Sequence, residues 1–220
     1  MKHRIVLLAA IVVPAFAGLV AQASSAPPDK SSLSISAKPA TITFGQTTVI
    51  SGKAKGPPSG PISVTLQQNP FPYADGFVDV ETKLSANNGD YAFAGLRPAL
   101  NTRYRVTTLV PPDTSSEAEV LVRIKVVLRV SDRTPRAGQR VRFYGTAAPQ
   151  HDGRTVRIQR QTTTGSWKTI ARTALRDSGA ERSKFSRSMR VRRDGVYRAR
   201  VYRDADHATG TSGPKSVDVH

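Results

Sequence analysis

The chain has 220 residues, of which 38% are hydrophobic and 22% charged, and its 33 basic and 16 acidic side chains give a formal net charge of +17. It contains no cysteine, which excludes disulfides, thiolate nucleophiles and cysteine metal ligands. The 16 glycines and 15 prolines are typical of a chain with many short strands and turns, and the ordinary hydrophobic content argues against intrinsic disorder.

The first 23 residues have the order of a secretory signal peptide. The basic start MKHR precedes a hydrophobic run over 5–20 and the small-residue site Ala21-Gln22-Ala23. An uncleaved membrane anchor is the alternative, but the run is shorter than the ~20 apolar residues that span a bilayer, and Pro14 and Gly18 interrupt it. We expect cleavage after Ala23, a flexible leader over 24–32, and an exported protein of the extracellular space or cell envelope without a membrane span.

The rest of the sequence repeats at an offset of 93 residues. Gly45-Gln46 matches Gly138-Gln139, Gly52 matches Gly145, and Tyr104-Arg105 matches Tyr197-Arg198. These sparse but ordered matches predict one duplicated fold, with a first domain over 33–124 and a second over 125–220.

Within each copy the hydrophobic residues alternate with polar ones, the period expected for strands that bury one face. The first copy predicts strands around 33–35, 49–51, 62–66, 77–80, 91–93, 104–106 and 120–122. The second predicts strands around 126–130, 141–143, 156–158, 167–170, 185, 189–191, 197–201 and 217–219. The predicted fold class is therefore all-β, with two tandem immunoglobulin-like β-sandwich domains after the signal peptide.

Several of these segments resemble known families. The stretch ANNGDYAFAGLRPALNTRYRV (86–106) is similar to carboxypeptidase-regulatory-like, prealbumin-type sandwich domains. The stretches AGQRVRFYGTA (137–147), VRIQRQTTTGSW (156–167) and GVYRARV (195–201) resemble immunoglobulin-like modules of secreted actinobacterial proteins. The resemblance implies a binding, spacing or cell-surface role and transfers no functional residue.

The junction of the two copies shows unbroken alternation. Every even residue from Val120 to Val130 is hydrophobic, with no glycine or proline between them. This pattern predicts that the last strand of the first domain continues directly into the second domain, and hence a stiff two-domain rod.

Positive charge is concentrated in the second copy. Residues 125–220 contain 22 basic and 8 acidic side chains, a net charge of +14, whereas residues 31–124 contain 8 and 7. Because side chains alternate along a strand, many of these arginines are expected on the outer faces of the sheets. This placement predicts binding to an anionic polymer or surface. The alternative is that the charge only keeps the surface soluble. The predicted polyanion-binding residues are Arg140, Arg142, Arg157, Arg190, Arg192, Arg198 and Arg200. No nucleic-acid recognition motif is present, so specific nucleic-acid binding is not expected.

Two loops of the second copy contain side chains that bind metals. His151 and Asp152 follow its second strand, and Asp204, Asp206 and His207 follow its sixth. Because these loops lie at the same end of an immunoglobulin-type sandwich, the five residues are candidate ligands for a zinc or calcium ion. The simpler interpretation, which the sequence favours, is that Asp152-Gly153 is a turn and 204–207 is a solvated loop.

The segment 69–77 contains Phe71, Tyr73 and Phe77 beside two prolines at a predicted hairpin tip. These aromatic rings are a candidate contact for a sugar or a protein partner. The alternative is that they pack against their own sandwich.

No catalytic motif is present, so we expect neither an enzyme nor a cofactor. The leading hypothesis is an exported, non-catalytic binding or spacer protein whose second domain associates by charge with anionic cell-envelope polymers or surfaces. The alternative is a structural or partner-binding protein that uses the aromatic hairpin.

Overall fold

The computed structural model describes residues 31–56 and 60–220, and all regular secondary structure in these residues is β-strand. The all-β, sandwich-like fold predicted from the sequence is therefore confirmed. In this part of the chain there is no helix that could cross a membrane. The predicted signal peptide and residues 24–30 of the predicted leader lie outside the described residues.

Residues 31–123, which we call the N-terminal half, form two sheets. One has the order β1-β4-β2 with β7 also paired to β4, and the other has the order β3-β10-β8-β5-β6 with β9 paired to β8. Strands β3 and β10 pair in parallel, and the other pairs are antiparallel. The strands are β1 (Ser32–Leu33), β2 (Ser36–Lys38), β3 (Thr41–Thr43), β4 (Thr48–Lys55), β5 (Ser63–Pro70), β6 (Val78–Leu84), β7 (Asp90–Leu96), β8 (Thr102–Leu109), β9 (Pro112–Thr114) and β10 (Ala118–Arg123).

Residues 124–220, which we call the C-terminal half, form two further sheets. One has the order β11-β12-β16-β15, and the other has the order β14-β13-β17-β18 with β19 also paired to β17. Strands β12 and β16 thus share one sheet, and β13 and β17 share the other. The strands are β11 (Lys125–Val130), β12 (Arg140–Ala148), β13 (Thr155–Gln161), β14 (Trp167–Ala174), β15 (Arg176–Asp177), β16 (Ser183–Arg190), β17 (Gly195–Val201), β18 (Gly210–Thr211) and β19 (Lys215–Val217).

Each half encloses its own hydrophobic core, because the alternating residues of its two sheets face each other. The N-terminal core is built around the rings of Phe93 and Tyr104, and the C-terminal core around those of Phe143 and Tyr197. All four rings are buried. Since side chains alternate between the two faces of a strand, the polar neighbours of these residues point away from the cores.

The strands differ from the prediction in a few places. The predicted strands around Phe185 and Met189 are a single strand, β16, and Val191 is buried just beyond its end. The short strands β3, β9, β15 and β18 were not predicted, since two or three residues are too few to show an alternating pattern.

The two repeated glycines, Gly52 and Gly145, have the same structural role. A Cβ at Gly145 would overlap the backbone carbonyl oxygen of Val127, and a Cβ at Gly52 would overlap that of Ser34. In each half this carbonyl lies on, or directly after, the strand that pairs with the strand of the glycine, β1 with β4 and β11 with β12. The repeat therefore conserves a backbone contact that excludes a side chain.

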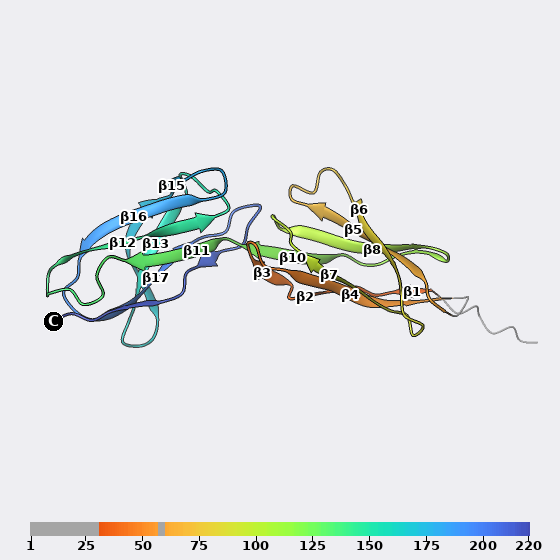
Figure 1. Ribbon diagram of the computed structural model, residues 1–220, viewed down its shortest axis with the longest axis horizontal. Helices are drawn as coiled ribbons and strands as arrows, with labels where there is room; N and C mark the ends of the chain where they lie inside the picture. The colour runs from red at the N-terminus through yellow and green to blue at the C-terminus, as the bar shows by residue number, and fades with distance from the viewer. Residues whose placement is uncertain (1–30, 57–59) are drawn as a thin grey trace, which may run out of the picture.

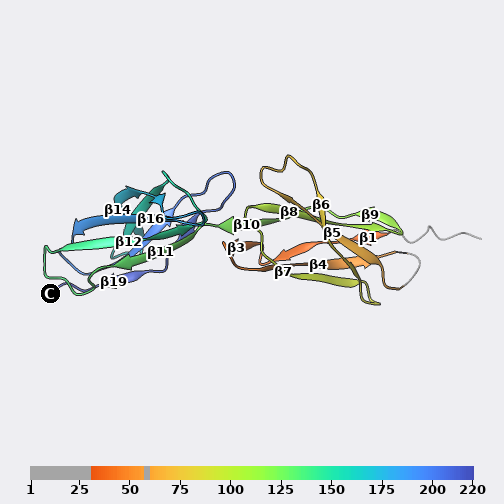
Figure 2. The same ribbon diagram turned by 45° about the horizontal axis from the view of Figure 1, so that its top comes forward.

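The two halves lie end to end along the long axis of the molecule (Figures 1 and 2). At the junction of the two halves, the predicted continuous strand is divided into β10 and β11, although the alternating residues Val122, Ile124 and Val126 are all buried. Pairing is interrupted at Ile124, which lies between β10 and β11 and packs in the C-terminal core. The chain thus passes from one core to the other within two residues.

Substitution of Gly145 by alanine tests this close backbone contact. We expect Gly145→Ala to lower the free energy of unfolding by about 2 kcal/mol or more, because the added methyl group forces β11 away from β12. Thr146→Ala, one residue further along β12, should change it by less than about 1 kcal/mol. Chemical denaturation measures both, and equal effects of the two substitutions would contradict the account.

Candidate functional site

Arginines lie on the outer face of the β11-β12-β16-β15 sheet. Arg140 and Arg190 are directly opposed on β12 and β16, and Arg142 is opposed to Ser188. All three arginines are exposed, as is Arg192 just beyond β16. The structure therefore places these four predicted residues on the surface, with Arg140 and Arg190 as a pair of like charges.

A row of three arginines crosses the outer face of the other sheet. Arg157 on β13 is directly opposed to Arg172 on β14 and to Arg200 on β17. Like charges directly opposed on neighbouring strands destabilise a sheet. We call Arg172, Arg157 and Arg200 the arginine row; Arg172 was not among the predicted site residues.

Aromatic rings offset part of this repulsion. The guanidinium groups of Arg157 and Arg200 lie 4.4 and 4.9 Å from the ring centroid of Tyr202, and that of Arg198 lies 4.1 Å from Trp167. Arg198 Nε also donates a hydrogen bond of 2.8 Å to Gln159. Burial, and next the charge of Arg200, lower the pKa of Arg198. Cation–π contacts stabilise such groups while leaving most of their N–H donors available.

Carboxylates do little to neutralise these arginines. The C-terminal half contains 18 arginines, all of them in the described part of the chain. Arg154 is the only one with a carboxylate oxygen in ion-pair range, Asp204 Oδ2 at 3.7 Å. In addition, Nε of Arg200 is buried and has no hydrogen-bond partner. The positive charge of this half is therefore mostly uncompensated.

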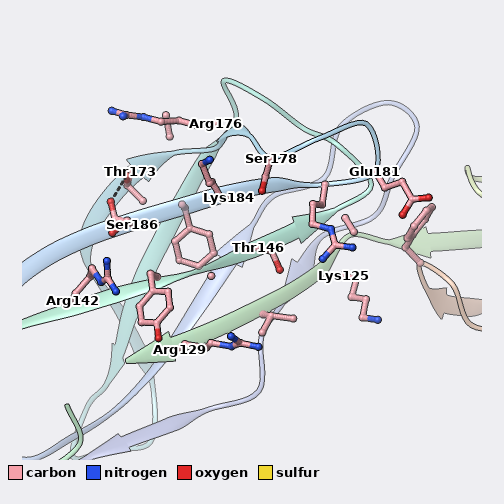
Figure 3. Close-up of a pocket in the computed structure, with 18 of the residues that line it drawn as sticks. Lys125, Arg129, Arg142, Thr146, Thr173, Arg176, Ser178, Glu181, Lys184 and Ser186 are labelled. Atoms are coloured by element: carbon pink, nitrogen blue, oxygen red, sulfur yellow. Dashed lines mark hydrogen bonds between the residues drawn. The ribbon is translucent and has the colours of Figure 1, made fainter. Parts of the chain in front are cut away.

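A groove of about 890 Å³ runs over the outer face of the β11-β12-β16-β15 sheet and reaches the N-terminal half at Phe44 and Gly45. Figure 3 shows Lys125, Arg129, Arg142, Arg176 and Lys184 around it, contributed by β11, β12, β15 and β16. Arg182 also lines it, and Glu181 is its only acidic lining residue. We call this the basic groove.

Of the groove's basic residues, only Arg142 was predicted as a site residue. Strand parity could have identified Lys125 and Arg129, because they alternate with the hydrophobic residues of β11. Arg176, Arg182 and Lys184 lie on and beside the short strand β15, where the sequence shows no pattern.

The three aromatic residues of the predicted hairpin tip are half-buried against their own half. Phe71 and Tyr73 pack edge to face with ring centroids 5.7 Å apart, and Arg103 lies 4.2 Å over the Tyr73 ring. Arg105 lies 4.2 Å over the Phe77 ring. These rings are already engaged by arginines of β8, as the alternative interpretation of the hairpin expected. A partner contact at this hairpin remains a prediction.

Four of the five predicted metal ligands lie together. The ligand atoms of His151, Asp204, Asp206 and His207 all lie within 4.8 Å of one another. His151 Nε2 is 3.2 Å from Asp204 Oδ2, and His207 Nδ1 is 3.2 Å from Asp206 Oδ1. We call these four residues the His–Asp cluster. The loop 204–207 is not simply solvated, because only 1% of the His207 side chain is exposed.

Asp152 is the predicted ligand that does not join the cluster. Its carboxylate accepts hydrogen bonds from Ser183 Oγ at 2.5 Å and from the side-chain amide of Gln150 at 2.6 Å. Asp152-Gly153 forms a turn, as the simpler interpretation expected, with Gly153 at φ +78°. Asp152 therefore helps to hold the His151 loop in place.

The two carboxyl groups of the cluster have pKa values shifted in opposite directions. Burial, together with hydrogen bonding to Asp206 and the charge of Asp206, raises the pKa of Asp204. Burial opposes ionisation of Asp206 as well, but the neighbouring Asp204 and His207 side chains outweigh this effect and lower the pKa of Asp206. Two carboxylates this close repel each other unless a proton or a cation lies between them.

No family model and no curated protein matches the sequence. Among solved structures, the chain is similar to red sea bream transglutaminase, with 13% identity and a TM-score of 0.43 over 84% of this chain and 31% of that one. It is also similar to a variant of Salmonella alpha-2-macroglobulin, with 10% identity and a TM-score of 0.35 over 82% of this chain and 16% of that one. The chain spans less than a third of the length of either protein, and neither match bears on function.

Substitution of Arg172 by threonine tests the repulsion within the arginine row. We expect Arg172→Thr to raise the free energy of unfolding by about 0.5 kcal/mol at low salt, because one like-charge pair is removed, and the gain should vanish at high salt. Lys38→Thr on β2, where the opposed residue is Val49, controls for strand propensity. An equal, salt-independent gain in both variants, measured by denaturant unfolding, would show that the row carries no such repulsion.

Proposed function

We propose that this chain is an exported, non-catalytic binding and spacer protein whose C-terminal half associates by charge with anionic cell-envelope polymers or surfaces. The observation that carries the proposal is the arginine row, in which three like charges are held in register across neighbouring strands without a carboxylate partner. Such an arrangement costs folding stability, and a bound polyanion would remove that cost.

The basic groove supports the same function on the other sheet. Six basic side chains and one acidic side chain line it, so its potential is strongly positive. A linear polyanion presents evenly spaced negative groups to such a surface and releases bound counterions when it associates. Since both outer faces are basic, the C-terminal half would be attracted to an extended anionic material without needing a unique orientation.

The aromatic hairpin is the weaker alternative as a binding site. Its Tyr73 and Phe77 rings already contact Arg103 and Arg105, and Tyr73 also donates a hydrogen bond of 3.3 Å to Glu119. A partner at this tip would compete with these internal contacts. The N-terminal half fits the role of a spacer, because its charge is nearly balanced.

Binding to long-chain polyphosphate at several salt concentrations tests the proposal. We expect the affinity to fall steeply with ionic strength, because exposed charges are screened within about 8 Å at physiological salt. The double variants Arg157→Ala with Arg200→Ala, and Arg142→Ala with Lys184→Ala, should each reduce both the affinity and its salt dependence. The slope of log K against log salt should become shallower by about one for each lost phosphate contact.

The matched control is the double variant Lys38→Ala with Lys55→Ala, which removes two exposed charges from the N-terminal half and should leave binding unchanged. Affinity that is independent of salt, or an equal loss in the control and the two test variants, would contradict the electrostatic mechanism.

A further inference from the structure

The hydrogen bond of His151 to the backbone determines which of its ring nitrogens is available. His151 Nδ1 lies 2.8 Å from the carbonyl oxygen of Pro149, and a carbonyl oxygen can only accept, so Nδ1 carries the proton. In the neutral imidazole, Nε2 then has a free lone pair. This atom is 3.2 Å from Asp204 Oδ2. The nitrogen that faces the cluster is therefore the one that can bind a cation.

His207 shows the same arrangement with its nitrogens exchanged. Its Nε2 lies 2.9 Å from the carbonyl oxygen of Ala99 and must donate to it, which leaves the Nδ1 lone pair free in the neutral ring. Nδ1 is buried and has no hydrogen-bond partner, because Asp206 Oδ1, at 3.2 Å, lies outside hydrogen-bonding geometry. His207 Nδ1 is therefore a second buried nitrogen that can bind a cation.

From this geometry we propose that His151, Asp204, Asp206 and His207 bind one zinc ion. Two imidazole nitrogens and two carboxylate oxygens make a complete tetrahedral set for zinc, whereas calcium takes oxygen ligands. Bonds of about 2.0–2.2 Å separate tetrahedral ligand atoms by roughly 3.3–3.6 Å. The two His–Asp separations of 3.2 Å are already close to that spacing. The proposal departs from the sequence-based expectation that the chain needs no cofactor.

The surroundings of the cluster match those of protein zinc sites. Ligating histidines usually donate their second nitrogen to a carbonyl or carboxylate, and both histidines donate to backbone carbonyls here. Asp204 Oδ1 accepts a hydrogen bond of 2.9 Å from the His207 backbone N–H, which leaves Oδ2 for the ion. The Asp206 side chain is 38% exposed and provides a route of entry from solvent.

One cation already lies near the cluster, the guanidinium of Arg154 at 3.7 Å from Asp204 Oδ2. Its terminal nitrogen donates hydrogen bonds of 3.0 and 2.8 Å to the carbonyl oxygens of Tyr202 and Arg203. These carbonyls hold the guanidinium beside the carboxylate, so Arg154 neutralises part of the charge of Asp204.

A zinc ion at this position would strengthen the contact between the two halves. The ligand His207 is joined to the N-terminal half through Ala99, and the backbone carbonyl of Asp206 accepts a hydrogen bond of 2.9 Å from the Asn101 N–H. The ion would fix the loop between β17 and β18 against the loop that contains His151. The site is thus a structural one, at the junction.

The test uses the full chain without an affinity tag, titrated with zinc by calorimetry and melted in zinc or in chelator. We expect one zinc per chain and a melting temperature that rises by roughly 5–10 °C at about a hundredfold excess over Kd. Cobalt in place of zinc should give the intense visible absorption of a tetrahedral site. Calcium should produce neither effect.

Asp206→Asn is the main test variant, because its partly exposed carboxylate can be neutralised without emptying the core. We expect it, and His151→Gln, to weaken zinc binding at least tenfold and to lose the rise in melting temperature. Asp218→Asn, which neutralises an exposed carboxylate of the same half outside the cluster, should bind zinc as the unmodified chain does. Identical melting in zinc and chelator, or undiminished zinc binding by Asp206→Asn, would overturn the proposal.

Discussion

The backbone hydrogen bonds at the chain crossing are the constraint on which both candidate sites depend. Ala208 N donates to Val122 O at 2.8 Å, and Ile124 N donates to Ala208 O at 3.1 Å. Ala208 belongs to the loop between β17 and β18 of the C-terminal half. Its two hydrogen bonds attach this loop to the residues on either side of Arg123, where the chain leaves the N-terminal half. Gly210 allows this approach, since a Cβ there would overlap the carbonyl oxygen of Ile124. Rotation of one half against the other would break these bonds, so we expect the crossing to behave as a fixed joint rather than as a flexible linker.

The same loop connects the joint to the sites. It contains three residues of the His–Asp cluster, and the ring of Phe44 from the N-terminal half lies 6.4 Å from that of His207. Phe44 also lines the end of the basic groove. Residues of the N-terminal half therefore line one end of the groove and contact His207 of the cluster. The proposed zinc ion and the proposed polyanion would each bind a surface whose shape depends on the alignment of the halves.

The sequence predicted the features that arise from local periodicity. Alternation located most strands, the repeat at 93 residues identified Gly52 and Gly145, and parity placed Arg157 and Arg200 on an outer face. It also placed the loops of His151 and His207 at one end of a sandwich. The sequence could not give the directions of side chains within those loops. Asp152 was therefore included among the predicted ligands, although its carboxylate accepts a hydrogen bond from Ser183 Oγ instead. Nor could the sequence show the groove, because its lining residues are far apart along the chain, and Phe44 reaches it only through the placement of one half against the other.

Both candidate sites depend on the rigidity of the joint, which can be measured because the chain contains no cysteine. Cysteines introduced at two exposed positions, Lys38 on β2 and Lys168 on β14, would be the only labelling sites in the chain. Pulsed electron spin resonance between spin labels at these positions reports the distribution of distances between the two halves. The account predicts a single narrow distribution, set by the labels' own rotamers. A broad distribution, typical of halves that reorient freely about residues 122–124, would contradict it.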